Sequence, residues 1–130
     1  MKPMQTLKQW HRIVAQRDTG LLDEVLAADC VFHSPVVHTP QRGRELTRVY
    51  LSGAMHVLRD NFRYVREVVG ERDAVLEFLC DIDGIEVNGV DILQFDDEGR
   101  ICEFKVMLRP LKAINTVHER MRQMLESLKA

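Results

Sequence analysis

Residues Ile85–Arg109, with the sequence IEVNGVDILQFDDEGRICEFKVMLR, contain the pattern that decides the fold. Apolar and polar residues alternate along both halves of this stretch, as they do in strands that bury one face. Between the halves, Asp97–Gly99 supply the residue types of a tight turn. The stretch therefore predicts two antiparallel strands with one apolar face. That face carries Ile85, Val87, Gly89, Asp91, Leu93 and Phe95 from the first strand and Cys102, Phe104, Val106 and Leu108 from the second.

Asp91 is the only charged residue on this predicted face. An ionised carboxylate in apolar surroundings costs several kcal/mol unless it is paired. We therefore expect Asp91 to be paired, hydrated in a cavity, or protonated. Two interpretations stay open: a carboxyl that faces a ligand pocket, and a structural carboxylate satisfied by the backbone or by an arginine.

The dipeptide Asn88–Gly89 interrupts the same strand. As a turn it would leave strands too short to pair, so we interpret it as a β-bulge that bends the sheet. A bent sheet presents a concave face on which a cavity can form.

The composition is that of one ordinary globular domain spanning residues 1–130, with 45% hydrophobic and 29% charged residues. A formal net charge of -2 argues against a general nucleic-acid binder, because no basic excess is available to replace counterions on phosphates. No apolar run approaches the roughly 20 residues of a membrane span, and the N-terminal residues lack the apolar core of a signal peptide. We expect a cytoplasmic protein that binds neither nucleic acid nor membrane.

The rest of the chain predicts helices that cover one face of a curved, mainly antiparallel sheet, which is an α+β architecture shaped like a cone. Pro110 suits the first position of a closing helix over residues 110–128. The other expected elements are helices at Met4–Arg17, Leu21–Leu26 and Arg44–Arg59, strands at Cys30–Ser34, Phe62–Val69 and Ala74–Ile82, and a loop at Val36–Gly43.

The opposite face of the predicted sheet is also partly apolar. An apolar patch on an otherwise polar sheet commonly marks an interface, so we expect a homodimer that packs through this outer face. The residues expected there are Val75, Leu79, Val90, Ile92, Ile101 and Met107.

The element order, the segment DEVLAADCVFHSP, the loop reaching Gly43 and above all VNGVDILQFDDEGRI resemble the nuclear transport factor 2-like superfamily. Within it the chain is similar to SnoaL-like proteins and to ketosteroid isomerase. The resemblance extends from about Leu7 to Arg109 and leaves residues 110–128 as a C-terminal helical extension. It implies a cystatin-like, cone-shaped fold, which hosts isomerases, cyclases, epoxide hydrolases and non-enzymatic modules.

Carried over by position, the resemblance makes Asp91 the acid that ketosteroid isomerase keeps protonated to hydrogen-bond an oxyanion. The isomerase's general base corresponds to Ser34 before Pro35, and its oxyanion tyrosine corresponds to Ile13. Both groups are missing here, so steroid isomerisation by that mechanism is not expected. His33 and His38 flank Pro35 and are the alternative candidates for a catalytic base, since histidine titrates near neutral pH. Each can also be a plain loop histidine near solvent.

We therefore predict a protein that binds a small, largely apolar organic ligand in its cone, with Asp91 as the catalytic acid or base of an isomerase, cyclase or hydrolase-like step. The competing hypothesis is a non-catalytic dimerisation or carrier module in which Asp91 is structural. Ligand chemistry predicts a cavity of roughly 300 Å³ or more around Asp91. No motif calls for a cofactor or a metal. The residues expected to line the pocket are Trp10, Phe32, Ser34, Tyr50, Phe78, Leu93, Phe104 and Leu108.

Overall fold

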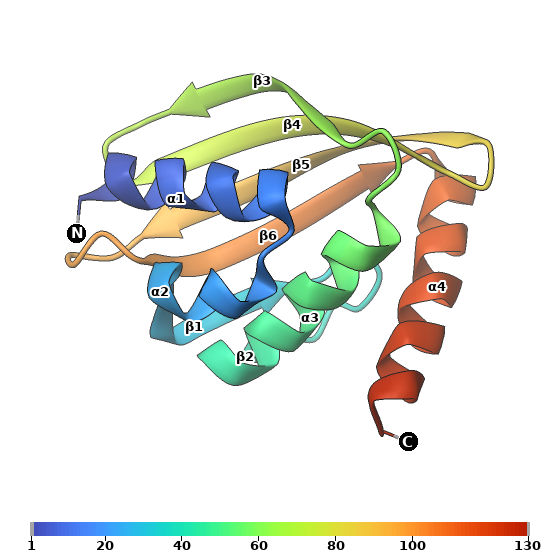
Figure 1. The fold of residues 1–130 in the computed structure, drawn as a ribbon, viewed down its shortest axis with the longest axis horizontal. Coiled ribbons are helices and arrows are strands. Elements are labelled where there is room, and N and C mark those ends of the chain that lie inside the picture. The colour runs from blue at the N-terminus through green and yellow to red at the C-terminus, as the bar shows by residue number, and fades with distance from the viewer. Residues whose placement is uncertain (1, 130) are drawn as a thin grey trace.

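The computed structural model describes residues 2–129 and shows a curved six-stranded sheet with its helices gathered on one side (Figure 1). In chain order the elements are α1 (Pro3–Gln16), a 3-10 helix (Thr19–Leu21), α2 (Leu22–Val25), β1 (Leu26–His33), β2 (Gln41–Arg42), α3 (Arg44–Val57), β3 (Arg63–Val69), β4 (Asp73–Ile82), β5 (Ile85–Phe95), β6 (Ile101–Arg109) and α4 (Leu111–Lys129). The strands lie in the order β2-β1-β6-β5-β4-β3, and within the described residues only β1 and β6 pair in parallel. This is the expected α+β fold with a mainly antiparallel curved sheet.

Strands β4, β5 and β6 form the two long hairpins at the centre of the sheet, as the alternation predicted. Asp91 lies opposite Leu76 of β4 and opposite Val106 of β6. Every second residue of β4 is buried from Ala74 to Ile82, and the same is true of β5 from Val87 to Phe95. The concave face is therefore the apolar face, and Asp91 lies on it.

The predicted bulge at Asn88–Gly89 is wrong. The pairing of β5 runs without a shift through both residues, against β4 on one side and β6 on the other. Gly89 is required for a different reason: a Cβ atom there would lie 2.4 Å from Cζ of Phe78 and 2.7 Å from Cδ2 of Leu108. Glycine allows these two side chains to close over the strand.

The register between β5 and β6 shifts instead at the far end of the hairpin. Gln94 pairs with Glu103 while Phe95 pairs with Ile101, so Cys102 is the extra residue. This shift turns Ile101 into the core, where it is fully buried, and leaves Cys102 only partly buried. The expectation that Ile101 lies on the outer face and Cys102 on the inner face was therefore wrong, whereas Val75 and Met107 are exposed on the outer face as predicted.

Strand β1 starts at Leu26, four residues earlier than expected, and α2 is correspondingly short. The closely spaced apolar residues from Leu21 to Leu26 suit a helix as well as a strand. Parallel pairing of Leu26 with Ile101 places Leu26 in the strand. Within the predicted loop Val36–Gly43, Gln41 and Arg42 form the two-residue strand β2 against β1.

The C-terminal helix α4 packs on α3 of the same chain (Figure 1). The helices meet at Gly53, where an added Cβ would lie 3.1 Å from Cε of Met121. Arg120 donates two hydrogen bonds, at 2.6 and 2.7 Å, to the carboxylate of Asp83 in the turn between β4 and β5. Across residues 2–129 no helix has the length and hydrophobicity needed to cross a membrane.

Candidate functional site

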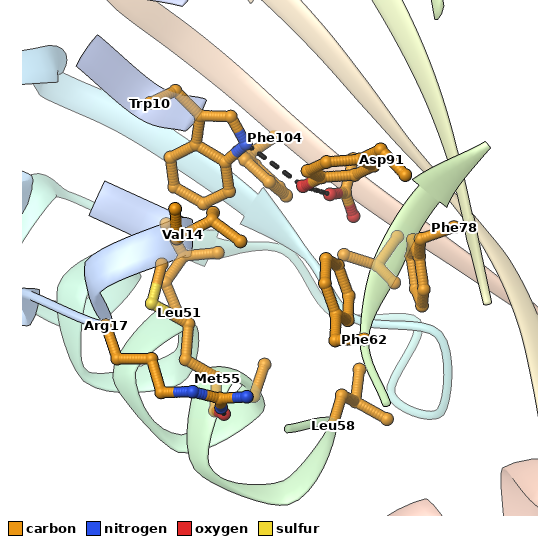
Figure 2. Close-up of a pocket in the computed structure, with 14 residues that line it drawn as sticks. Trp10, Val14, Arg17, Leu51, Met55, Leu58, Phe62, Phe78, Asp91 and Phe104 are labelled. Atoms are coloured by element: carbon orange, nitrogen blue, oxygen red, sulfur yellow. Dashed lines mark hydrogen bonds between the residues drawn. The ribbon is translucent and has the colours of Figure 1, made fainter. Parts of the chain in front are cut away.

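A cavity of about 160 Å³ lies between α1, α3 and the concave face of the sheet (Figure 2). Its wall is mainly aromatic and aliphatic, and among the described residues only Asp91 and Arg17 line it with an ionisable side chain. The prediction of a cavity of roughly 300 Å³ or more around Asp91 is therefore wrong, because the volume found is about half of that size. Paired rings narrow the space: the centroids of Trp10 and Phe104, and those of Phe62 and Phe78, are 4.9 Å apart.

Asp91 is held at the wall of this cavity by the middle of β5, and its side chain is only 5% exposed. The hydroxyl of Tyr64 donates a hydrogen bond to Oδ2 of Asp91 at 2.6 Å. Oδ1 receives no hydrogen bond from residues 2–129. Among the side chains of residues 2–127, no oxygen or nitrogen is both fully enclosed and unpartnered, so Oδ1 opens to the cavity. It is the carboxyl oxygen that a ligand can contact.

Tyr64 reaches Asp91 from β3, at the edge of the sheet. It pairs with Phe78 of β4, whose ring faces the concave side, and the register shifts between Tyr64 and Arg66. The indole N–H of Trp10 on α1 donates to the Tyr64 hydroxyl at 3.0 Å. Trp10 therefore donates to Tyr64, and Tyr64 donates to the Asp91 carboxyl. Figure 2 draws these two hydrogen bonds as dashed lines between the labelled Trp10 and Asp91.

Burial raises the pKa of Asp91 to about 7, because desolvation disfavours the charged carboxylate. The hydrogen bond from Tyr64 opposes this shift, since it stabilises the carboxylate. Burial and the neighbouring Asp91 also raise the pKa of Tyr64 well above its usual value, so the phenol keeps its proton. Asp91 is thus a group that gains or loses a proton near neutral pH.

Arg17 lies at the rim of the cavity, across from Asp91 (Figure 2). It follows the last residue of α1 in a left-handed conformation, with φ of 54°. Its Nη1 donates to the carbonyl oxygen of Met55 at 3.1 Å, and its Nη2 donates to the carbonyl oxygen of Arg59. These acceptors belong to the C-terminal end of α3 and the residues after it, and they hold the guanidinium beside the opening.

A second cavity of about 180 Å³ adjoins the first and shares Ala54, Leu58 and Val106 with it. Helix α4 closes this second space with side chains that include Val117, His118 and Met121. The predicted pocket residues divide between the two cavities. Trp10, Phe78 and Phe104 line the first with Asp91, whereas Phe32, Ser34, Tyr50 and Leu108 line the second, and Leu93 is buried and lines neither.

His33 and His38 do not face either cavity, contrary to what their proposed role as catalytic bases required. Phe32 pairs with Phe104 and points inward, so His33, which pairs with Lys105, points to the outer face. There its Nε2 lies 2.9 Å from Oε1 of Glu103. His38 is exposed in the loop before β2. Both line a separate groove with Lys105 and Met107, and neither lines the cavity at Asp91.

Tyr64 and Arg17 were not predicted from the sequence as residues of this site. Tyr64 lies in a strand with weak alternation, and the one available signal was that Phe62 and Tyr64 are two residues apart and so share a face. Ile13, the position matched to the oxyanion tyrosine of the isomerase, is fully buried and does not line the cavity. No group of three metal-ligating side chains occurs within residues 2–129.

Comparisons with known proteins agree with this fold. Residues 7–104 match the model of the SnoaL-like domain. A steroid delta-isomerase from Pseudomonas aeruginosa is similar at 35% identity and a TM-score of 0.93, with 98% of this chain and 95% of that chain covered. A protein with a cystatin-like fold from Silicibacter pomeroyi DSS-3 is similar at 29% identity and a TM-score of 0.87, with 95% of this chain and 85% of that chain covered. No curated protein matches the chain.

Proposed function

The chain belongs to the SnoaL-like domain family, and from this premise we propose that it is a small isomerase-type enzyme in which Asp91 moves a proton on a monocyclic, largely apolar ketone. The observation that carries the proposal is the placement of Asp91: an apolar cavity surrounds its carboxyl, one oxygen is held by Tyr64, and the other is open. The similarity to a steroid delta-isomerase over almost the whole chain supports the reaction class.

The proposed step is a shift of one proton along a β,γ-unsaturated ketone. Oδ1 of the Asp91 carboxylate accepts the proton of the carbon between the carbonyl and the double bond. The electron pair of that C–H bond forms a new C=C bond, and the carbonyl π pair moves to the oxygen to give a dienolate. The same proton then returns to the γ-carbon, the carbonyl re-forms, and a conjugated enone leaves with Asp91 again ionised. A base with a pKa near 7 suits this transfer at neutral pH.

Cavity size selects the substrate. An apolar cavity of about 150 Å³ accommodates a molecule of the size of benzene, and the cavity at Asp91 is about 160 Å³. A single ring therefore fits the space at Asp91, whereas a larger skeleton would also need the adjoining cavity under α4. We accordingly expect activity on one-ring ketones.

The direct test is the conversion of 3-cyclohexenone to 2-cyclohexenone, followed by the ultraviolet absorbance of the conjugated product. We expect enzyme-dependent conversion whose rate rises with pH through about 7, as Asp91 becomes ionised. NMR in deuterated water should show deuterium entering the ring no faster than 2-cyclohexenone forms. No conversion and no solvent exchange over this pH range would remove the catalytic proposal.

Replacing Tyr64 with phenylalanine is expected to shift the rising limb of this pH profile upward by about one unit. The hydrogen bond from Tyr64 stabilises the carboxylate, and a hydrogen bond to a charged group contributes on the order of 1.5 kcal/mol or more. Tyr50→Phe is the matched control, because Tyr50 stacks on Phe32 and lines the second cavity instead. An unchanged profile in Tyr64→Phe would show that this hydrogen bond does not tune Asp91.

A non-catalytic carrier is the second candidate, and one observation favours it. Among the described residues, Asp91 is the only acidic one that lines the first cavity, and neither His33 nor His38 lies there to act as a second acid or base. A carrier would bind one-ring ketones, and the bound ketone would raise the melting temperature of the protein. It would produce neither enone nor solvent exchange. The two assays above therefore separate the two functions.

We also propose that two copies associate through the outer face of the sheet. Val68, Val75 and Ile92 are neighbours across β3, β4 and β5, and Val68 and Met107 are 60% and 52% exposed. An apolar row of this kind on a polar sheet is typical of an interface. The thiols of Cys30, Cys80 and Cys102 are unpaired, which supports a cytoplasmic setting for the assembly.

Val75→Asp is expected to convert the dimer to a monomer. Two symmetry-related carboxylates would be buried without partners, which should weaken association about 100-fold or more. Light scattering after size-exclusion chromatography measures the mass. Leu111→Asp is the control, since Leu111 is 72% exposed and is the first residue of α4 instead of a strand residue. A wild-type chain that is monomeric at high concentration would contradict the proposal.

A further inference from the structure

Arg17 is the basic residue that lines the first cavity, and the proposed proton-transfer step does not use it. Two of its N–H groups are bound to the backbone carbonyls of Met55 and Arg59, which fixes the position of the guanidinium at the rim. No carboxylate within residues 2–129 forms an ion pair with it. Its other N–H groups remain available to an acceptor.

The cavity therefore has a polar group at each of two opposite sides and an apolar wall between them. Asp91 Oδ1 lies at the inner side, and the Arg17 guanidinium lies at the rim (Figure 2). Val14, Leu51, Met55 and Leu58 line the space around these two groups and offer no side-chain group that could bind an anion. A ligand that matches this arrangement has an oxygen at one end, a ring in the middle and an anionic group at the other end.

We infer that the natural ligand is a small cyclic acid, whose carboxylate is bound by Arg17 while its carbonyl or enol end reaches Asp91. This inference rests on the proposed function of the cavity and specifies its substrate class. Guanidinium is well suited to the task, because its planar N–H groups bind a carboxylate through two parallel hydrogen bonds. Its fixed position lowers the entropic cost of binding.

Phenolic acids provide the test, because a phenol has the shape of an enol and cannot be converted further. The probes are para-hydroxybenzoate, para-hydroxyphenylacetate and para-hydroxyphenylpropionate, each paired with its methyl ester. The three acids place the carboxylate at increasing distances from the hydroxyl, so one of them should span from Asp91 to Arg17. Isothermal titration calorimetry measures the affinity of each member of a pair.

For the best-fitting acid we expect binding about fivefold tighter than that of its ester, the upper end of what a solvent-exposed ion pair contributes. Arg17→Gln should abolish this preference, and Arg17→Lys should retain part of it. Arg12→Gln removes the same charge from an exposed position of α1 outside the cavity wall and should behave as the wild type. Thermal melts of all variants show whether loss of the hydrogen bonds to Met55 and Arg59 has destabilised the fold. Arg17→Lys keeps the positive charge and so separates the effect of the charge from that of the guanidinium geometry.

Equal affinity for acid and ester in the wild type, an unchanged preference in Arg17→Gln, or no binding of either member of any pair would overturn this inference. Its failure is distinct from failure of the proposed function. If 3-cyclohexenone is converted while acids are not preferred, only the assignment of Arg17 is wrong. If the ketone is not converted and no probe binds, both are wrong.

Discussion

Asp91→Asn is expected to raise the free energy of unfolding by about 4 kcal/mol at pH 8 and to change it little at pH 4, while it slows the proton-transfer reaction at least 100-fold. Asparagine has nearly the shape of aspartate and can accept the Tyr64 hydrogen bond through its amide oxygen. It carries no charge at any pH. The variant therefore removes the cost of a buried carboxylate without opening a hole in the wall.

The direction follows from the pKa of Asp91, which burial raises from 3.8 to about 7. Between these two values the folded chain holds a proton that the unfolded chain has released, so the wild type loses stability as pH rises through this range. Below pH 3.8 both states are protonated and the penalty is absent; above about 7 it is complete. The Asn variant has no such term, so the two stability curves should separate between pH 4 and pH 7.

Urea unfolding followed by the fluorescence of Trp10, the single tryptophan of the chain, measures both curves. Asp73→Asn serves as the control, because Asp73 is an exposed aspartate at the start of β4. Its curve should run parallel to that of the wild type. If the Asn variant at position 91 were less stable than the wild type at pH 8, Asp91 would be a structural carboxylate.

The same variant should convert 3-cyclohexenone at least 100-fold more slowly than the wild type, the low end of what general acid–base groups contribute. An amide cannot accept the carbon-bound proton. If the Asn variant is more stable than the wild type and also inactive, Asp91 is a residue that serves the reaction at the expense of stability. Full activity in the variant would instead remove Asp91 from the mechanism.

Gly89→Ala is expected to lower the free energy of unfolding by about 3 kcal/mol, at the upper end of the range for overpacking a core. The new methyl group would lie 2.4 Å from Cζ of Phe78 and 2.7 Å from Cδ2 of Leu108. Phe78 is 1% exposed and stacks on Phe62, so the free space that borders its ring is the cavity at Asp91. Any movement that does occur displaces a wall of the cavity at Asp91.

Gly70→Ala is the matched control, since a Cβ there would lie 3.6 Å from the carbonyl oxygen of Asp73, an ordinary contact. Denaturant unfolding of both variants gives the comparison. A loss within about 0.5 kcal/mol for Gly89→Ala would mean that the core relaxes around the added methyl group and that the close approach of Phe78 is not important.

Much of the fold was predictable from local patterns. The alternation in Ile85–Phe95 and Ala74–Ile82 assigned strands and buried faces correctly, because a period of two places every second residue on the same side of a strand. The bulge was misplaced because a glycine in a strand has two explanations: a break in strand pairing, or a neighbouring side chain that lies too close to the backbone for a Cβ atom. Only the positions of Phe78 and Leu108, which come from other strands, show that the second applies at Gly89.

The sequence alone determined that a carboxyl lies on the apolar face of a curved sheet, since this depends only on alternation along one strand. The tertiary structure decided what surrounds that carboxyl. Trp10, Tyr64 and Asp91 come from α1, β3 and β5 and meet only when the sheet curves under the first helix. The side that His33 faces depends on its pairing with β6, and Arg17 reaches the rim because α3 ends beside it. Contacts between residues distant in sequence arise from packing, and no periodicity within a single segment encodes them.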